Sequence, residues 1–470
     1  MSDFKGLNVA LTAMLAHRRA IEVAGQNVAN ANTAGYTRQR ANLAAISAPV
    51  TPAIHARTTG VGGGVQVEDI ERLRDVFLDQ RALQENGADA SLKRTQSIFA
   101  QLEQVLGEPG DNGLAAQLSE FWAGWEDVAN QPGNEAARTQ LIQRAETLAS
   151  GLRKADGDIG RLRQGAVEEI STIVDEVNST AGQVAELNRA IQVATQNGMS
   201  PNDLADQRDL LVDRLAKYAG ATTRPAKDGL VDVYLGGTAI VRGYETVKLA
   251  KPTTDATGAV QIAWANDNYP VELTGGELLG LRQGVNVTLS AGTVGGVDGY
   301  RKKLNDVAAA LMTAVNAQHQ AGLDFQSPTA QPGAAFFTGT GAGDITVNPA
   351  IADNPMLVAA AKPSAGRLDG SNAQAMTDLA TAAGGADATY HAFVVQLGVE
   401  ADTANRRASI QADVLTEVES ARQSASGVNL DEEMTNLVGS QHAYAAAARL
   451  MTAVDEALDT LINRTGMVGR

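Results

Sequence analysis

The sequence of 470 residues predicts a mainly α-helical, elongated protein with one inserted β-rich domain. Three observations predict this fold class. Every proline lies between Pro49 and Pro363, so both ends of the chain are free to form long helices. Apolar residues recur every seven positions near both termini. Between residues 218 and 296, β-branched runs alternate with glycine-rich turns, which is typical of short strands.

Each terminal helix is expected to carry one apolar stripe, close to a coiled-coil seam. The stripe of the N-terminal helix, residues 4–31, consists of Leu7, Leu11, Met14, Ile21 and Val28. The stripe of the C-terminal helix, residues 428–463, consists of Leu430, Leu437, Tyr444, Met451 and Leu458, with Gln441 as a polar interruption. Residues 1–40 carry five cations and two acids, and residues 430–470 carry three cations and six acids. The two helices are therefore expected to pair with each other.

The polar stretch NVANANTAGYTRQR, residues 27–40, follows the first helix. Three side chains can bond backbone groups freed at a helix end: those of Asn30, Asn32 and Thr33. Gly35 can adopt a positive φ, and Tyr36 is expected to pack at the junction. Arg38 and Arg40 are expected to face acidic neighbours. The stretch is thus predicted to be an elbow that turns the chain out toward a rod.

Helical patterns fill most of the interior. They cover residues 70–106, 114–129, 134–155, 157–197 and 204–216, with Asn202 or Asp203 as the expected cap of the last helix. Helical periodicity returns over residues 300–315 and 371–425, whereas residues 325–363 are irregular. Three domains are therefore expected. They are the terminal helices (1–40 with 430–470), a helical rod (41–217 with 297–429) and a β-rich outer domain (218–296).

The composition argues against most kinds of chemistry. The chain has no cysteine, and its five histidines show no metal-ligand spacing. The formal net charge of −16 disfavours a nucleic-acid partner. There is no apolar run of 18 residues, and the apolar stretch 6–16 has no cleavage site after it, so neither a membrane span nor a cleaved signal is expected. The stretch GVGGGV, residues 60–65, is interpreted as a turn or hairpin, and FWAGW, residues 121–125, as a core anchor. We expect no enzyme activity and no cofactor.

The elbow and the closing helix resemble the bacterial flagellar axial proteins, which comprise rod, hook and hook-associated proteins. GYTRQ, residues 35–39, is most similar to the hook-associated protein 1 family. The C-terminal motif is NLDEE followed by Gln-x-x-Tyr-x-Ala-x-Ala, which falls here on residues 429–433 and 441–448. Interior stretches also match, at residues 72–81, 113–138 and 204–216. Ala34 departs from the family, which often has proline there, and the β-rich middle is short.

The resemblance implies a structural adaptor that polymerises at the junction between hook and filament. It implies export through the flagellar type III channel, a location outside the cell, and terminal helices that are disordered in the monomer and fold on assembly. The implied partners are other copies of the chain, the hook protein, the next hook-associated junction protein, and an export chaperone at the C-terminal helix. The residues expected to carry assembly are those of the two stripes together with Asn30, Gly35 and Tyr36.

Three other functions stay open from the sequence. The protein could be a hook or rod protein of the same family. It could be a cytoplasmic coiled-coil scaffold, which would explain the heptads but not residues 27–40. An enzyme is the least supported, because no catalytic grouping is visible in the inserted domain.

Overall fold

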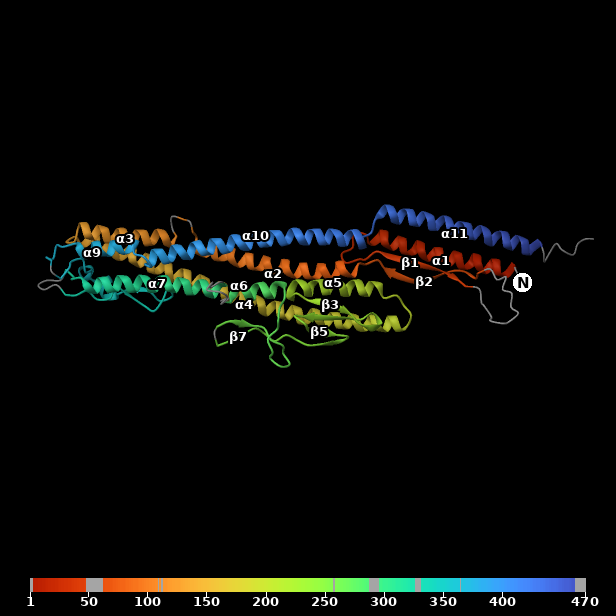
Figure 1. Ribbon diagram of the computed structural model, residues 1–470, viewed down its shortest axis with the longest axis horizontal. Helices are drawn as coiled ribbons and strands as arrows, with labels where there is room; N and C mark the ends of the chain where they lie inside the picture. Colours follow the sequence, from red (N-terminus) through yellow and green to blue (C-terminus); the bar gives the residue numbers. More distant parts are fainter. Residues whose placement is uncertain are drawn as a thin grey trace, which may run out of the picture.

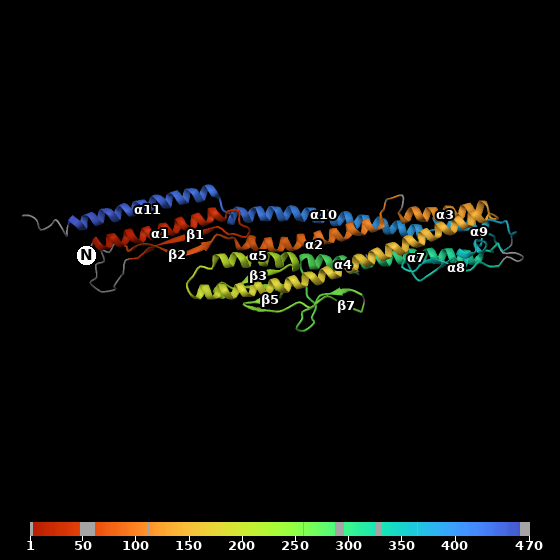
Figure 2. The ribbon, with the colours of Figure 1, turned by 180° about the vertical axis from the view of Figure 1, so that it is seen from behind.

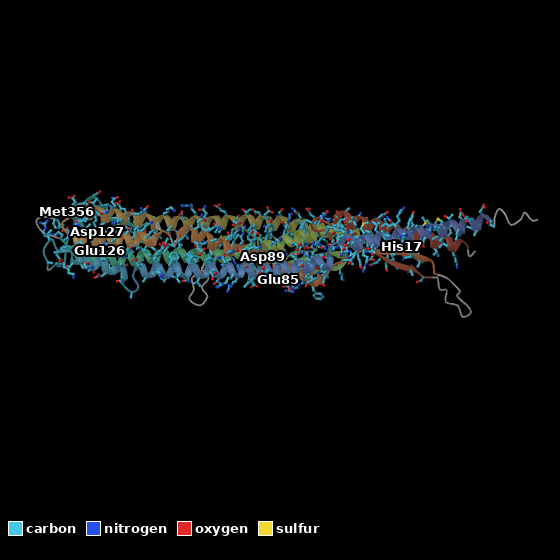
Figure 3. The ribbon with its side chains drawn as sticks, turned by 90° about the horizontal axis from the view of Figure 1, so that it is seen from above. His17, Glu85, Asp89, Glu126, Asp127 and Met356 are labelled. Carbon is cyan, nitrogen blue, oxygen red and sulfur yellow. The ribbon has the colours of Figure 1, made fainter. Side chains whose placement is uncertain are left out.

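The computed structural model describes residues 3–47, 62–108, 110, 113–256, 258–286, 296–325, 331–363 and 365–460. The molecule is long and narrow, with helices running along its axis (Figures 1 and 2). One end is formed by α1 (Asp3–Asn30), α11 (Leu430–Asp459) and the ribbon of β1 (Gln39–Ile46) and β2 (Gly64–Arg72). We call these four elements the terminal module and the rest the rod. Figure 3 shows His17 in the terminal module and Met356 near the opposite end. The predicted fold class is confirmed.

The rod is a bundle of helices that differ greatly in length. The long ones are α2 (Val76–Leu106), α3 (Leu114–Asn130), α4 (Glu135–Gln196), α5 (Asn202–Ala219), α7 (Gly296–Ala321) and α10 (Ala386–Ser426). The short ones are α6 (Gly276–Val285), α8 (Pro349–Asp353) and α9 (Ser371–Thr377). The sequence predicted two helices within residues 134–197, but α4 runs through without a break. Its Asp156 is buried and holds Arg301 of α7 through two hydrogen bonds of 2.8 and 2.9 Å. That contact helps to hold the helix across Gly157.

The sequence-based limits of two helices need correction. Helix α2 begins at Val76 rather than near residue 70, because Asp75 caps it by accepting hydrogen bonds from the amides of Phe77 and Leu78. Residues 64–72 form a strand instead. Helix α5 begins after Pro201 without a side-chain cap, so neither Asn202 nor Asp203 caps it as predicted. Their side chains bond the terminal module instead.

The β-rich segment lies along α4 (Figure 2). It contains an antiparallel sheet of β3 (Thr222–Pro225), β4 (Val231–Leu235), β5 (Thr238–Arg242) and β6 (Glu245–Thr246), and the pair β7 (Thr253–Thr254) with β8 (Val260–Gln261). The buried Asn188 of α4 donates hydrogen bonds to the carbonyls of Val231 and Gly243, at 2.8 and 2.6 Å. The strands predicted in this region are confirmed, although its last part forms the helix α6. A further small pair, β9 (Phe337–Thr338) with β10 (Thr346–Val347), lies near α7.

One cluster of aromatic residues lies near the far end of the rod. Phe121 and Trp125 of α3 are fully buried, as FWAGW predicted, and the Trp125 ring lies 5.3 Å from the ring of Phe336. The buried His319 of α7 packs against the same group, 5.4 Å from Phe336. These rings fill the space that the many alanines of the rod leave open.

Glycines let α6 approach α2 very closely. A Cβ atom on Gly280 would lie 2.3 Å from the carbonyl oxygen of Ser91 in α2. Since real Cβ atoms do not come so near to backbone oxygen, any larger residue at this position must push α6 away from α2.

We expect the variant Gly280→Ala to lower the free energy of unfolding by about 1–3 kcal/mol, because it overpacks the contact with α2. The matched control is Gly160→Ala, in an open stretch of α4 with no atom near its added Cβ. The control is expected to raise stability by about 0.5–1 kcal/mol through helix propensity. Urea unfolding followed by circular dichroism measures both, and equal effects of the two variants would contradict the close approach.

His319 is held neutral in the fold. Its Nδ1–H donates to the carbonyl of Ala334 at 2.6 Å, and its Nε2 accepts from the amide of Ala359 at 2.9 Å. Burial lowers the pKa of His319 to about 4, and the positive charge of Arg138 acts in the same direction. A second proton on the ring would break the bond from Ala359.

We therefore expect stability to fall as the pH is lowered from about 6.5 toward 4, because the unfolded chain binds a proton that the folded chain excludes. The loss from His319 at pH 5 should be about 2 kcal/mol relative to pH 8. Urea midpoints for the wild type and for His319→Gln at both pH values isolate this contribution. The variant His391→Gln, at an exposed histidine, is the control and should keep the wild-type slope.

Candidate assembly site at the terminal module

Helices α1 and α11 lie side by side and run in opposite directions (Figure 1). A Cβ on Gly6 would contact Val454 at 3.5 Å, and Asn27 near the other end of α1 bonds Glu433 near the start of α11. The pairing predicted for the two ends of the chain is therefore present. The most buried apolar side chains of the pair are small, namely Ala10, Ala16, Val23, Ala24 and Ala447.

Most predicted stripe residues lie at the edges of this contact rather than at its centre. The half-buried ones are Leu7, Met14, Ile21, Val28, Leu437, Tyr444, Met451 and Leu458. Three residues of the predicted stripes are exposed: Leu11, Leu430 and Gln441. The buried alanines allow α1 to lie close both to α11 and to the ribbon of β1 and β2. The part that these residues play in assembly stays a prediction.

The opposite side of α1 is uncovered in the single chain. Leu11 and Leu15 lie one turn apart on this side, and the Leu15 side chain is 50% exposed. On α11, Leu430, Met434 and Val438 form a second exposed row at four-residue spacing. We call these five residues the open rows. Exposed apolar residues gathered in rows mark contact surfaces more often than scattered ones do.

The elbow reverses the chain instead of leading it into the rod. Gly35 has a φ of 79°, as predicted, and α1 ends at Asn30, whose side chain bonds the carbonyl of Gln26. After the turn, β1 runs back along α1, pairs with β2 in an antiparallel ribbon, and only then does the chain enter α2. The elbow is therefore internal to the terminal module. The chain passes between module and rod at residues 73–75 and 427–429.

Asn27 is the centre of the elbow and is 1% exposed. Its Oδ1 accepts from the Tyr36 hydroxyl at 2.8 Å and from the Gln39 amide at 2.9 Å. Its Nδ2 donates to the Gln39 carbonyl at 2.8 Å and to Glu433 Oε2 at 2.9 Å. One side chain thus fixes α1, the turn, the start of β1 and α11 relative to one another, with its hydrogen-bonding capacity fully used.

Charged groups close the elbow on the side of α11. Arg38 binds Glu432 and the buried Glu433, both at 2.8 Å. Arg40 pairs with Glu71 of β2, so both elbow arginines face acids as predicted. Burial, followed by the negative charges of nearby acids, raises the pKa of Tyr36 to about 12. Its hydroxyl therefore stays protonated and can donate to Asn27.

Polar side chains of helix α5 in the rod form hydrogen bonds and ion pairs with the terminal module and with the segment that follows it. Asp206 accepts from the amide of Thr37 at 3.0 Å and from Arg72 at 2.8 Å. Asp209 accepts from Arg72 and Arg74. Although burial alone would raise the pKa of Asp209, the guanidinium groups around it hold that pKa below its usual range. We call the contacts of Asp206 and Asp209 with residues 37, 72 and 74 the clasp.

Asn202 adds two bonds to the ribbon. Its Nδ2 donates to the Ile70 carbonyl at 2.9 Å and to the Gln39 side chain at 3.2 Å. Within residues 204–216, which the sequence offered only as a family motif, Asp206 and Asp209 bind the rod to the terminal module, and Asn202 lies just before that motif.

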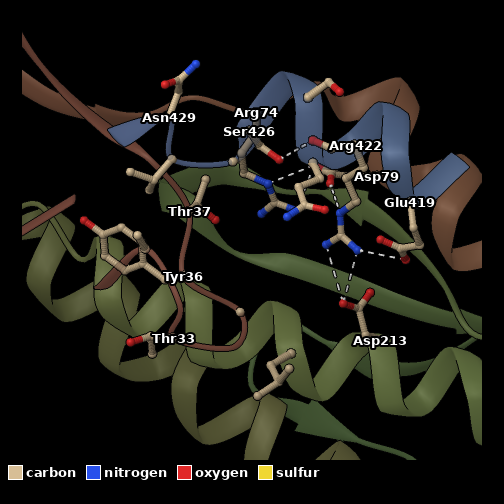
Figure 4. A pocket seen from close by; sticks show the side chains of 17 residues that line it. Thr33, Tyr36, Thr37, Arg74, Asp79, Asp213, Glu419, Arg422, Ser426 and Asn429 are labelled. Carbon is tan, nitrogen blue, oxygen red and sulfur yellow. Dashed lines mark hydrogen bonds and ion pairs between the residues drawn. The ribbon is translucent and has the colours of Figure 1, made fainter. Parts of the chain in front are cut away.

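A cleft of about 730 Å³ lies between the elbow, the end of α10 and the start of α2. Figure 4 shows Arg422 of α10 directed at Asp79, Asp213 and Glu419, with Tyr36 and Thr37 across the cleft. Burial raises the pKa of Asp213, although Arg422 opposes that shift. The lining is largely polar and its charges are paired, so the cleft belongs to the joint between module and rod.

The sequence did not single out Asn27, Gln39, Asp206 or Asp209. For Asn27 the sequence did contain a sign of burial, because this polar residue lies on the same side of α1 as the apolar Ala24 and Val23. In the part of the chain that the structure describes, no group of three or more histidine or acidic side chains could hold a metal ion. None of the described helices is long and apolar enough to cross a membrane.

We expect Asn27→Ala to loosen the elbow by removing the partner of the Tyr36 hydroxyl, both backbone bonds of Gln39 to this side chain and one bond of Glu433, each unpaired buried group costing about 1–3 kcal/mol. Amide exchange of β1 and of the first turns of α11 should become roughly 10- to 100-fold faster while exchange in α4 is unchanged. The control is Gln26→Ala, at the exposed neighbouring position of the same helix. Wild-type exchange in Asn27→Ala would show that the network does not hold the module together.

Comparison with known proteins places the chain in a family. The model of the FlgK helical domain of flagellar hook-associated protein matches residues 99–337. The models of the C-terminal part of the flagellar basal body rod proteins FlgEFG and of the flagella basal body rod protein match residues 419–464 and 7–37. These two short matches fall on α11 and on α1 with the elbow.

Full-length relatives carry one name. Flagellar hook-associated protein 1 of Bacillus subtilis (strain 168) is 32% identical over 510 aligned positions, covering 100% of both chains. The protein of the same name in Escherichia coli (strain K12) is 25% identical over 97% of this chain and 99% of its own length. The solved structure of the flagellar hook junction protein FlgK from Burkholderia pseudomallei matches the fold, with a TM-score of 0.63, 18% identity, and coverage of 73% of this chain and 100% of that one. The chain described here belongs to the flagellar hook-associated protein 1 family.

Proposed function

We propose that the protein is a structural adaptor that polymerises at the hook-filament junction of the bacterial flagellum and joins hook to filament. The observation that carries this proposal is the pair of open rows on α1 and α11. A single chain leaves Leu11, Leu15, Leu430, Met434 and Val438 in contact with water. Copies packed side by side would bury these rows, each large side chain contributing about 1.5–3 kcal/mol. The relatives named hook-associated protein 1 support the same role.

The partners follow from this position in the flagellum. Copies of the chain would form a ring or a helical layer, with the hook protein below and the next hook-associated protein above. The protein would reach this position outside the cell through the flagellar export channel, with a chaperone holding α11 beforehand. The narrow, alanine-lined contact between α1 and α11 supports terminal helices that gain their order on assembly.

The domain limits expected from the sequence change, because the ribbon of β1 and β2 packs with the two terminal helices. The inner domain would comprise α1, the elbow, β1, β2 and α11, and so extend to residue 72 rather than residue 40. The rod would begin at α2, and the β-rich segment up to about residue 275 would form its outer side. This division keeps each set of packed elements together.

A hook or rod protein is the second candidate, since rod-protein models match both ends of the chain. Immunogold labelling separates the two roles. Label confined to the joint between hook and filament supports the adaptor, whereas label along the hook or in the rod supports the alternative.

We expect Leu15→Asp to abolish filament attachment and motility in cells that lack the wild-type copy, because assembly would bury an unpaired carboxylate at a cost of several kcal/mol. Circular dichroism of the purified variant should match that of the wild type, since Leu15 is exposed in the single chain. The control is Val399→Asp, at an exposed valine of α10 far along the rod. Normal motility with Leu15→Asp would remove the open rows from the assembly contact.

A further inference from the structure

The first turn of α2 carries an aromatic side chain that the fold does not use. Phe77 is 84% exposed, the highest value among the large apolar side chains of the described residues, and its neighbour Val76 is also exposed. The helix start is already fixed by Asp75, which accepts hydrogen bonds from the backbone amides of Phe77 and Leu78, so the Phe77 side chain takes no part in the cap. The buried side of α2, with Ala82 and Asn86, lies on the far side of the helix from Phe77. A polar residue would satisfy the fold of the single chain equally well.

A hollow of about 200 Å³ lies beside the same turn, between α2, α5 and β3. Its apolar lining residues are Val76, Leu83, Val212, Pro225 and Val231. Its charged lining residues are four arginines (Arg72, Arg74, Arg208 and Arg422) and three aspartates (Asp79, Asp209 and Asp213). Guanidinium groups stack on aromatic faces, and apolar side chains accept a ring without hydrogen bonds. The chemistry of the hollow thus fits a phenyl side chain.

The arginines of the hollow do not require an acidic ligand, because acids of the same chain already balance their charges. Arg72 and Arg74 are held by Asp209, and Arg422 is held by Asp79 and Asp213. These ion pairs balance the charges of the three arginines. An aromatic occupant is therefore favoured over a carboxylate or phosphate.

We propose that Phe77 of one copy of this chain inserts into the hollow of the neighbouring copy. The inference rests on the proposed function, in which copies lie side by side. Phe77 and the hollow lie at the same level of the long axis, because Val76 lines the hollow and directly precedes Phe77. Two neighbouring copies at the same height can therefore bring Phe77 of one copy to the hollow of the other. Such a contact uses different surfaces on the two copies, so it repeats from copy to copy and closes into a ring or continues as a helical layer.

Two other exposed aromatic residues are less suited to this hollow. Tyr244 and Tyr269 belong to the β-rich segment, and Tyr269 lines a separate hollow there. They provide matched controls at positions of similar exposure.

The absence of cysteine from the sequence makes disulfide trapping specific. Cells lacking the wild-type copy would express two differently tagged chains, one with Phe77→Cys and one with Thr223→Cys, which lines the hollow from β3. Because the two cysteines are on different chains, a heterodimer can form only between copies. Oxidation of isolated flagella should give several-fold more heterodimer for this pair than for Tyr269→Cys with Thr223→Cys, or for Phe77→Cys with Arg224→Cys.

Equal cross-linking in all three pairs, with the chains present at the joint, would overturn the inference and leave the proposed function standing. Absence of the wild-type chain from the joint between hook and filament would overturn both. A second measurement fills the hollow by Thr223→Trp, which should reduce incorporation as much as Phe77→Ser does. The variant Arg224→Trp, on the opposite face of β3, should not reduce it.

Discussion

The hydrogen bonds of Asn27 are the contact on which the arrangement of both chain ends depends. A buried amide is costly unless all of its groups are paired, and here each partner comes from a different segment. The Tyr36 hydroxyl, the backbone of Gln39 and the carboxylate of Glu433 meet only if α1, the turn, the ribbon and α11 take one relative position. The apolar contact between α1 and α11 is largely alanine and tolerates sliding, so the polar network supplies the register that apolar packing does not.

The same combination of apolar contacts and specific polar ones extends into the rod. Leucine, isoleucine, valine and alanine fill the helix contacts, so a chain with only 4% aromatic residues still builds a packed narrow bundle. Specific polar contacts then fix the places where elements must not shift: Asp156 with Arg301, Asn188 with the β sheet, and the clasp of Asp206 and Asp209. The clasp differs from a salt bridge at a surface, because its arginines and aspartates are mostly buried and paired several times over. Removing one partner would leave charge without compensation inside the protein.

The sequence predicted the elements that depend on local pattern. Helix positions, the β-rich segment and the positive φ of Gly35 all follow from residues close to one another in the chain. The acids that face Arg38 lie almost 400 residues away, so the sequence predicted their charge but not their identity. The return of the chain as β1 did not follow, because a turn fixes its own dihedral angles but not the direction in which the chain continues to pack. The residues chosen for the helix pair were the large ones of the heptad count, whereas the most buried apolar residues of the pair include Ala10 and Ala24, which flank the predicted stripe. The partners of Asp206 lie more than 100 residues away, beyond the reach of any local pattern.

The single chain buries little apolar surface between α1 and α11, and the proposed assembly would bury more. A helix pair that buries alanines recovers little of the conformational entropy spent in ordering two helices of 28 and 30 residues. The large side chains that would recover more stand outward in the open rows. Asn27 and the clasp therefore set the geometry of the terminal module before its stability is complete. Neighbouring copies would then add apolar burial to a surface whose register is already fixed, which favours one mode of packing over the alternatives.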